Sequence, residues 1–338
     1  LMIGIAALPT GLLVVVIGNG WKSVRRAFVP VLVLAVVMAV VQYLLATNGL
    51  WSLGATGAGL VGLAVGFLLV RLPAFRNNLP EPIAAANEDS QDEGKSLWLS
   101  LIGYGLLVII AFTVNLVSPV EAFLSQVAFS LEFPEVSTRF GWVTGAGSGR
   151  VINLFSHPGA ILLYTCILSF LIYRALGYLG PGALKRIARN TAKSGVNSSL
   201  GILAMVGVAS IMMHSGMTYL LAQGLSVSFS RDLYPAVAPF IGALGAFITG
   251  SATNSNVLFG VLQQNTARLL NLSVPLILAA QSAGGSLGSL LAPAKVIVGS
   301  STVGLAGEEG TVMRKLLGYG LITIATVAVV ALIIHLIQ

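Results

Sequence analysis

Charged residues are scarce in this chain. Only 9% of its 338 residues are Asp, Glu, Lys or Arg, whereas 56% are hydrophobic; an ordinary soluble domain carries about 25% charged residues. The hydrophobic residues come in repeated blocks of roughly 20 residues, the length of a helix that crosses a hydrocarbon layer of ~30 Å. This excludes a water-soluble fold and predicts an all-α integral membrane protein, polytopic and helical.

Cysteine and the common catalytic motifs are nearly absent. Cys166 is the single cysteine, so neither a disulfide framework nor a Cys/His metal site is expected. The sequence has no GxxxxGK[ST] or HExxH motif, which would bind a nucleotide phosphate or zinc. Every Asp and Glu falls in or beside a loop, which leaves an intramembrane hydrolase without its acid. We therefore expect no enzyme, no metal and no cofactor.

Two other features have simple structural interpretations. The net charge of +7 does not indicate nucleic-acid binding, because the basic residues lie in short loops between apolar blocks rather than on one face of a soluble domain. The GxGxxG pattern from Gly57 to Gly62 lies within an apolar block, without the preceding strand of a dinucleotide site. It predicts a surface on which two helices pack closely.

The apolar blocks indicate about ten membrane crossings. Placing the loop around Lys22 in the cytoplasm puts the basic loop residues on the same side, apart from Arg139, Arg150 and Arg231. Because cytoplasmic loops carry an excess of Lys and Arg, this orientation is preferred, and it places the carboxy terminus outside. The blocks are 1–18, 27–46, 51–70, 97–117, 158–179, 200–221, 236–270, 272–291, 292–306 and 316–337.

Composition also divides the chain. It begins with Leu1, inside an apolar block, so we expect a preceding half to be missing and residues 1–75 to be the last membrane helices of that half. Residues 76–96 are polar, contain Pro and become acidic, which predicts a cytoplasmic linker. Residues 97–338 are expected to form a second bundle with the substrate site at about 249–304.

Two connecting segments have their own signals. Residues 118–157 contain a stretch rich in Gly, Ser and Thr, which predicts irregular external turns, with an amphipathic segment at 120–131. Residues 182–193 (GALKRIARNTAK) space their basic residues along one face. They predict a short surface helix inside that binds anionic lipid; a regulatory partner is the alternative.

The strongest functional signal is a polar interruption of the later apolar blocks. Residues 249–256 read TGSATNSN, and the next blocks contain QSAGGS at 281–286, Pro293, and GSST at 299–302. Unwound backbone costs several kcal/mol per unpaired group in hydrocarbon, so it survives only where it lines a cavity. We therefore expect residues 250–256 and 293–301 to be non-helical and to face one another at the bilayer midplane, as in carriers with broken helices.

The polar groups of these stretches suit a small anion. Hydroxyl and amide side chains offer neutral donors, and a helix that begins after Asn254 would point its positive end into the cavity. Lys295 is the one basic residue inside a block; it either pairs with a substrate carboxylate or extends to the headgroups. His214 is a candidate proton relay or a hydrogen-bonded core residue. The candidate substrate ligands are Ser251, Thr253, Asn254, Ser255, Asn256, Gly284, Gly285, Lys295 and Ser301.

The same residues carry a family resemblance. The run GALGAFITGS at 242–251, its continuation TNSNVLF at 253–259, and residues 281–304 resemble the signature of the lactate permease family. This resemblance implies uptake of L-lactate, and often D-lactate or glycolate, by proton symport across a bacterial inner membrane. It also implies a longer chain. Members commonly have Asp or Asn where this chain has Ala252, a departure inside the expected site.

Three hypotheses remain open from the sequence. The first is a proton-coupled monocarboxylate symporter, the second a related carrier for other carboxylates, driven by sodium, and the third a membrane subunit or enzyme without transport of its own. Because such carriers place the site between two repeats and only one set of broken helices is present, we expect the 338-residue chain alone not to transport,. The expected partners are the substrate, protons, membrane lipid, the missing amino-terminal half and a second copy in a homo-oligomer.

Overall fold

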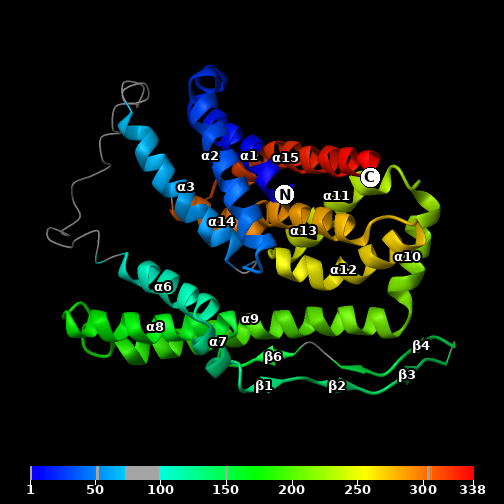
Figure 1. Cartoon of the computed structure of the whole chain (residues 1–338), viewed down its shortest axis with the longest axis horizontal. Coiled ribbons are helices and arrows are strands. Elements are labelled where there is room, and N and C mark those ends of the chain that lie inside the picture. Colours follow the sequence, from blue (N-terminus) through cyan, green and yellow to red (C-terminus); the bar gives the residue numbers. More distant parts are fainter. Residues whose placement is uncertain are drawn as a thin grey trace. The chain divides into compact units, whose positions relative to one another are not determined.

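The computed structural model describes residues 2–50, 53–72, 99, 101–139, 141–148, 151–302, 305 and 307–338 (Figure 1). The chain forms two compact units. Unit 1 consists of Leu1–Ala39, Val136–Thr144 and Ser194–Gln338, and unit 2 of Val40–Glu135 and Gly145–Lys193. The predicted linker at 76–96 lies outside the described residues.

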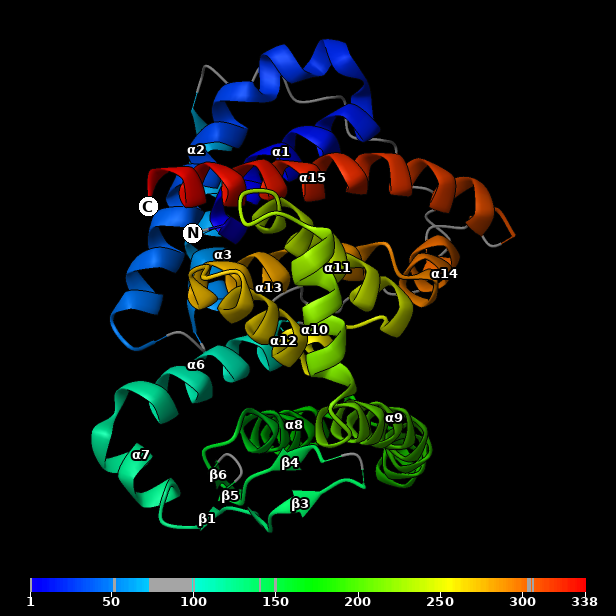
Figure 2. The ribbon, with the colours of Figure 1, turned by 90° about the vertical axis from the view of Figure 1, so that its right-hand side faces the viewer.

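Unit 1 contains the later helices and both ends of the chain. Its helices α1 and α15 contact one another, and α11, α12 and α13 form its centre (Figure 2). Two helices, α2 and α9, belong partly to each unit. The elements of unit 1 are α1 (Met2–Asn19), the first part of α2 (Trp21–Thr47), β3 (Val136–Ser137), β4 (Val143–Thr144), the later part of α9 (Ala183–His214), α10 (Met217–Ser228), α11 (Tyr234–Thr249), α12 (Ala252–Leu269), α13 (Val274–Leu290), α14 (Pro293–Thr302) and α15 (Glu309–Ile337).

Unit 2 combines helices with short strands. Its helices α6 and α8 pack together, and the Tyr173 hydroxyl donates to the Leu99 carbonyl oxygen at 2.6 Å. Its elements are the end of α2, α3 (Gly54–Arg71), α6 (Ile102–Leu116), α7 (Ser118–Leu124), β1 (Ala128–Phe129), β2 (Glu132–Phe133), β5 (Gly147–Ser148), β6 (Ile152–Asn153), α8 (Pro158–Ala175) and the start of α9.

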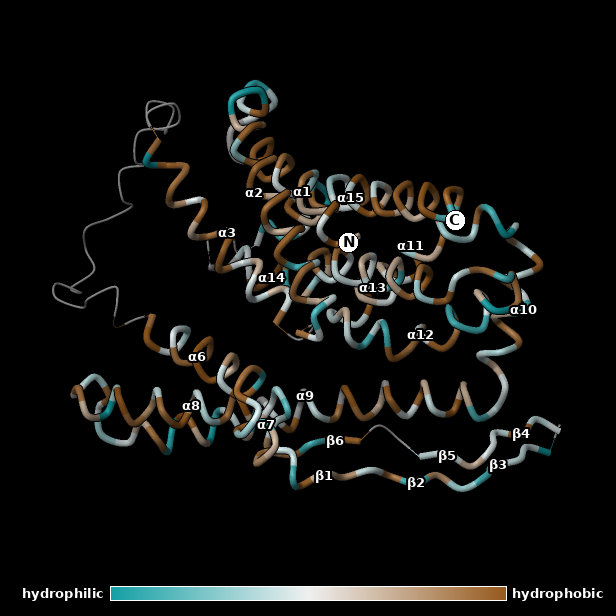
Figure 3. The backbone as a smooth tube through the Cα atoms, in the orientation of Figure 1, coloured by the Kyte–Doolittle hydropathy of each residue, from teal (hydrophilic) through white to brown (hydrophobic). Residues whose placement is uncertain are grey.

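The predicted all-α membrane architecture is confirmed in its main feature. Among the described residues, five helices are long and apolar enough to cross a membrane, or up to seven if each bent pair is one span. Large apolar side chains such as Val14, Leu63 and Ile337 are well exposed on helices of both units, as expected where lipid rather than water is the solvent. Figure 3 shows α2, α6 and α15 as largely hydrophobic tubes.

The loop predicted as irregular turns at 118–157 contains extended backbone instead. Three antiparallel ladders pair β1 with β6, β2 with β5 and β3 with β4. The predicted amphipathic segment at 120–131 is helical only to the end of α7 at Leu124. The strands are two residues long and mostly exposed on both faces, so they lack the alternation of apolar and polar residues by which strands are recognised.

Helix α9 also differs from its prediction. The expected short surface helix at 182–193 and the start of the next apolar block form one helix of 32 residues, which ends at His214. After it, Gly216 adopts the left-handed conformation (φ 81°) and α10 begins at Met217. We call residues 214–217 the elbow. Glycine permits this conformation without the steric cost that a Cβ imposes.

Small residues bring α11 and α13 together at the centre of unit 1. A Cβ added to Gly284 would overlap the Pro239 carbonyl oxygen, and one added to Gly242 would overlap the Gln281 carbonyl oxygen. The backbones of the two helices are therefore in direct contact, the arrangement by which membrane helices gain van der Waals packing. In the GxGxxG pattern, a Cβ on Gly57 of α3 would overlap the Leu45 side chain of α2, whereas one on Gly59 would meet no atom within 4 Å.

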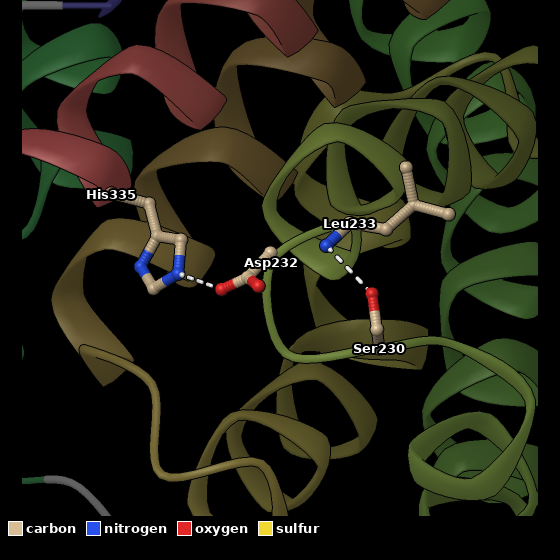
Figure 4. A network of polar contacts seen from close by, with 4 residues as sticks. All are labelled: Ser230, Asp232, Leu233 and His335. Atoms are coloured by element: carbon tan, nitrogen blue, oxygen red, sulfur yellow. Dashed lines mark hydrogen bonds and ion pairs between the residues drawn. The ribbon is translucent and has the colours of Figure 1, made fainter.

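A polar contact joins the end of α15 to the turn before α11. The His335 ring nitrogen Nε2 lies 3.3 Å from Asp232 Oδ1, and the amide of Leu233 donates to Ser230 Oγ at 3.3 Å (Figure 4). The imidazole is largely covered, with 11% of its side chain exposed, whereas the carboxylate is 76% exposed. This contact lies at the turn that precedes Tyr234.

Candidate functional site

The first helix break is shorter than predicted. Helix α11 ends at Thr249, Gly250 is left-handed (φ 74°), and Ser251 is extended (φ −145°, ψ 126°). The Ser251 hydroxyl accepts a hydrogen bond from the Asn254 amide at 3.3 Å, which is the bond of a helix N-cap. Helix α12 therefore begins at Ala252, and the prediction that residues up to Asn256 are non-helical is wrong.

The second break is shorter still. Helix α13 ends at Leu290 and α14 begins at Pro293. The prediction of non-helical backbone at 293–301 is wrong, because proline at the first position of a helix needs no N–H acceptor and has a suitable φ. Residues Val274–Ser300 together still have the length and composition of one membrane span.

The two breaks lie next to one another. A Cβ added to Gly250 would be 4.0 Å from the Ala292 Cβ, and one added to Gly285 would be 3.8 Å from the Ala252 Cβ. The expectation that the breaks face each other is confirmed in this respect, although each break is only about two residues long. The site is thus a pair of helix junctions. Its placement at the midplane stays a prediction.

A buried polar network runs beside the first junction. The Tyr234 hydroxyl donates to Gln263 Oε1 at 2.7 Å, and Gln263 Nε2 donates to Gln281 Oε1 at 2.9 Å. Gln281 Nε2 donates to Ser255 Oγ at 3.1 Å, and the Ser255 hydroxyl donates to the Gly242 carbonyl oxygen at 2.7 Å. Each of the four residues whose side chains form this network has at most 1% of its surface exposed. We call this set, Tyr234, Gln263, Gln281 and Ser255, the polar chain.

The polar chain changes the role of Ser255. The sequence predicts a substrate ligand at this position, yet its hydroxyl is already used within the bundle. Sequence reasoning missed Tyr234 and Gln263 as members of the site. Ser255, Gln263 and Thr266 are all buried on α12, and their spacing of eight and eleven residues places them on one helix face, which is a signal that was present in the sequence.

Asn256 is the ligand candidate with an available atom. Its Nδ2 donates to Ser282 Oγ at 3.0 Å, while its buried Oδ1 has no described hydrogen-bond partner. The amides of Ala252 and Thr253 have no acceptor among the described residues, as expected for the first turn of a helix. Together these groups offer two donors and one acceptor at the start of α12.

Lys295 has a local partner. The residue is exposed, and its ammonium group donates to Ser289 Oγ at 3.1 Å, near the carboxy end of α13. A cation is favourable at this position, because the last carbonyl groups of a helix carry partial negative charge. The contact is compatible with a cation that stabilises α13 and with one that also meets a substrate.

The remaining candidates fall into two groups. Gly284 and Gly285 are buried helix-contact residues opposite α11 and Ala252. His214 ends α9, and its buried Nδ1 has no described partner; no described contact joins it to the polar chain. Ser301 belongs to α14, and its side chain lies outside the part of the chain that the structure describes.

The arrangement recognises a ligand mainly through neutral hydrogen-bonding groups. Within the described residues, no group of three His, Cys, Asp or Glu side chains could hold a metal ion. The groups around the junctions are amides, hydroxyls and one lysine. Such groups hold a small anion by hydrogen bonds, each worth about 1.5–3 kcal/mol when one partner is charged.

Comparison with known proteins gives one family. The family model described as L-lactate permease matches residues 1–338. The chain is similar to the glycolate permease of Escherichia coli K12, with 34% identity over 134 residues that cover 40% of this chain and 24% of that protein. It is similar to the L-lactate permease of Bacillus subtilis 168, with 35% identity over 136 residues, 40% of this chain and 24% of that protein.

A third relative matches over a longer region. A protein of Haemophilus influenzae is 24% identical over 331 residues, which cover 92% of this chain and 60% of that protein. The chain thus spans less than two thirds of the length of each of these relatives. No solved structure matches the chain.

Proposed function

The chain belongs to the L-lactate permease family, and from this premise we propose that it acts in a membrane carrier that imports L-lactate and related small 2-hydroxy monocarboxylates, D-lactate and glycolate, by proton symport. The proposed location is the bacterial inner membrane. Two of the relatives are named for L-lactate and glycolate, which share a carboxylate next to a hydroxyl group.

One observation carries the proposal. The two helix junctions adjoin, and the first five residues of α12 beside them offer unused groups of both kinds, the amides of Ala252 and Thr253 as donors and Asn256 Oδ1 as acceptor. The substrate carboxylate accepts hydrogen bonds from the two amides, as anions do at helix N-termini. The 2-hydroxyl group of the substrate donates to Asn256 Oδ1. An anion without a hydroxyl leaves the Asn256 oxygen unpaired, which disfavours its binding.

The alternative is a sodium-driven carrier for other carboxylates, and an uptake assay separates the two. We expect proteoliposomes with the full-length protein to accumulate labelled L-lactate when the inside is alkaline, and not when only a sodium gradient is imposed. Liposomes without protein and liposomes with the Bacillus subtilis L-lactate permease are the controls. Accumulation that depends on the sodium gradient and not on the pH gradient would mean that sodium, not the proton, is the coupling ion. Uptake by the 338-residue chain alone would contradict the expectation that it needs a partner.

A second expected result concerns Lys295. Lys295→Gln should weaken L-lactate binding at least tenfold, or about 1.4 kcal/mol, if the ammonium group pairs with the carboxylate. The structure supplies the control, because Ser289→Ala removes only the hydroxyl that accepts from Lys295. Binding is measured by isothermal titration in detergent. Equal weakening in both variants would assign the lysine to the end of α13, and unchanged binding in Lys295→Gln would remove it from the site.

A further inference from the structure

Unpaired polar atoms concentrate at the elbow between α9 and α10. Among the described residues, the buried side-chain N and O atoms without a hydrogen-bond partner are Trp142 Nε1, Thr144 Oγ1, Ser169 Oγ, His214 Nδ1, Asn256 Oδ1 and Ser300 Oγ. Three of these, on Trp142, Thr144 and His214, belong to the elbow, to β4, or to the residue directly before β4. Such atoms are rare in folded proteins, and each needs an explanation, such as a bound water or ion.

The fold brings Trp142 onto the elbow, which His214 begins. The Trp142 ring lies on the elbow, because a Cβ added to Gly216 would be 2.9 Å from Trp142 Cδ2. The ring centroid of Trp142 is also 5.2 Å from that of Tyr219 on α10. His214 is the last residue of α9, two residues before Gly216.

The direction of the Thr144 side chain follows from the strand geometry. It lies two residues after Trp142, in β4, where it pairs with Val136 of β3. The turn between these strands is closed by Thr138, whose amide donates to the Trp142 carbonyl oxygen at 2.8 Å. Since side chains two residues apart share one face of a strand, Thr144 projects from the same face as Trp142, the face that meets the elbow.

The chemistry of these atoms selects an anion. The indole nitrogen only donates, the threonine hydroxyl donates or accepts, and an imidazole Nδ1 donates in one tautomer and in the protonated ring. An indole N–H cannot ligate a metal cation. Arg139, an exposed cation, lies in the same turn between β3 and β4, and its charge favours a negative ligand nearby.

We propose that Trp142, Thr144 and His214 bind a small carboxylate at a second site on the elbow, separate from the helix junctions. A carboxylate presents two acceptor oxygens side by side, which match donors from adjacent elements. The ligand class rests on the indole N–H, which only donates, and on the cation of Arg139 in the same turn; its identity with the transported substrate rests on the function proposed above. In the predicted orientation the strands are external, so the site would hold a carboxylate on the outer side of the protein.

Trp142 itself reports binding. The 338 residues contain four tryptophans, so in this 338-residue chain, purified in lipid nanodiscs, the substitutions Trp21→Phe, Trp51→Phe and Trp98→Phe leave Trp142 as the single emitter. We expect L-lactate and acetate to change its emission saturably, and sodium chloride at equal ionic strength not to. Absence of a saturable change, or an equal change with chloride, would overturn the proposal and leave ordered water as the partner of these atoms.

Variants locate the bound anion. Thr144→Val should weaken the carboxylate titration at least about fivefold, or roughly 1 kcal/mol, and Thr144→Ser, which keeps the hydroxyl, should restore it. Thr326→Val is the matched control, because the Thr326 hydroxyl bonds only the Ile322 carbonyl oxygen of its own helix. Equal titrations in Thr144→Val and Thr326→Val would remove Thr144 from the site and contradict the proposal.

Different results would contradict the proposed transport function and the proposed elbow site. Asn256→Ala should lower L-lactate uptake while the Trp142 titration stays as it was. If carboxylates titrate Trp142 but the protein shows no uptake of L-lactate, the proposed transport function is wrong and the elbow site stands. If uptake is normal and Trp142 does not respond to carboxylates, the elbow site is wrong and the transport function stands.

Discussion

Replacing Gly284 by alanine is expected to cause a large loss of stability. The added Cβ would overlap the carbonyl oxygen, carbonyl carbon and Cα of Pro239 on α11. These are backbone atoms that cannot move without displacing the helix, and overpacking of a well-packed core costs typically 1–3 kcal/mol and sometimes more. We expect a loss of roughly 3 kcal/mol, measured as a lower unfolding midpoint in a denaturant titration of the purified protein in mixed micelles.

The chain offers a matched control for this result. Gly260 lies in the neighbouring helix α12, and an added Cβ would meet no atom within 4 Å. Gly260→Ala should therefore unfold at the same midpoint or slightly above it, because alanine is the better helix former. Equal stability of the two variants would show that α11 and α13 do not touch through Gly284.

Replacing Gln281 by leucine should also have a large effect. Leucine fills a similar volume but cannot accept from Gln263 Nε2 or donate to Ser255 Oγ. Leaving a buried polar group unpaired costs about 1–3 kcal/mol, although hydrogen bonds between membrane helices average only about 0.6 kcal/mol in double-mutant cycles. We expect a loss of about 2 kcal/mol in the same denaturant titration.

The control for Gln281 lies next to the polar chain. Gln264→Leu makes the same chemical change one residue from Gln263, at a position that is only partly buried. It should leave the midpoint nearly unchanged. The double variant Gln263→Leu with Gln281→Leu should lose less than the sum of the two single losses, because each single change leaves the other amide unpaired. Additive losses would mean that the two glutamines do not interact.

The membrane architecture could be predicted from composition because it depends on a property of the whole chain. A deficit of charge spread over 338 residues leaves only hydrocarbon as a suitable solvent, whatever the order of the helices. Local breaks are different, since Ser, Thr and Asn favour both unwound backbone and the first positions of a helix. At Ser251 the side chain decides between them by accepting from the Asn254 amide.

The polar chain shows which kind of contact could not be predicted from a single sequence, namely a contact between side chains of different helices. Tyr234 and Gln263 are 29 residues apart and meet through the packing of α11 on α12. Hydrophobic periodicity predicts that each helix exists, but the partner of a buried side chain depends on how two helices cross. The common face of Ser255 and Gln263 could be predicted from their spacing; the hydroxyl of Tyr234 could not be assigned to it.

The contact between α11 and α13 limits how these helices can slide past one another. Gly284 and Gly288 of α13 each lie against the backbone of α11, at Pro239 and Ala243, and their spacing of four residues corresponds to ~6 Å along the helix, slightly more than one turn. A shift of one or two residues would bring a side chain onto these carbonyl groups. A step of a whole turn would bring Ala280 or Ala292, each of which has a Cβ, to one of these contacts. The pair can therefore move only as one rigid body, one of the discrete movements known for packed helices.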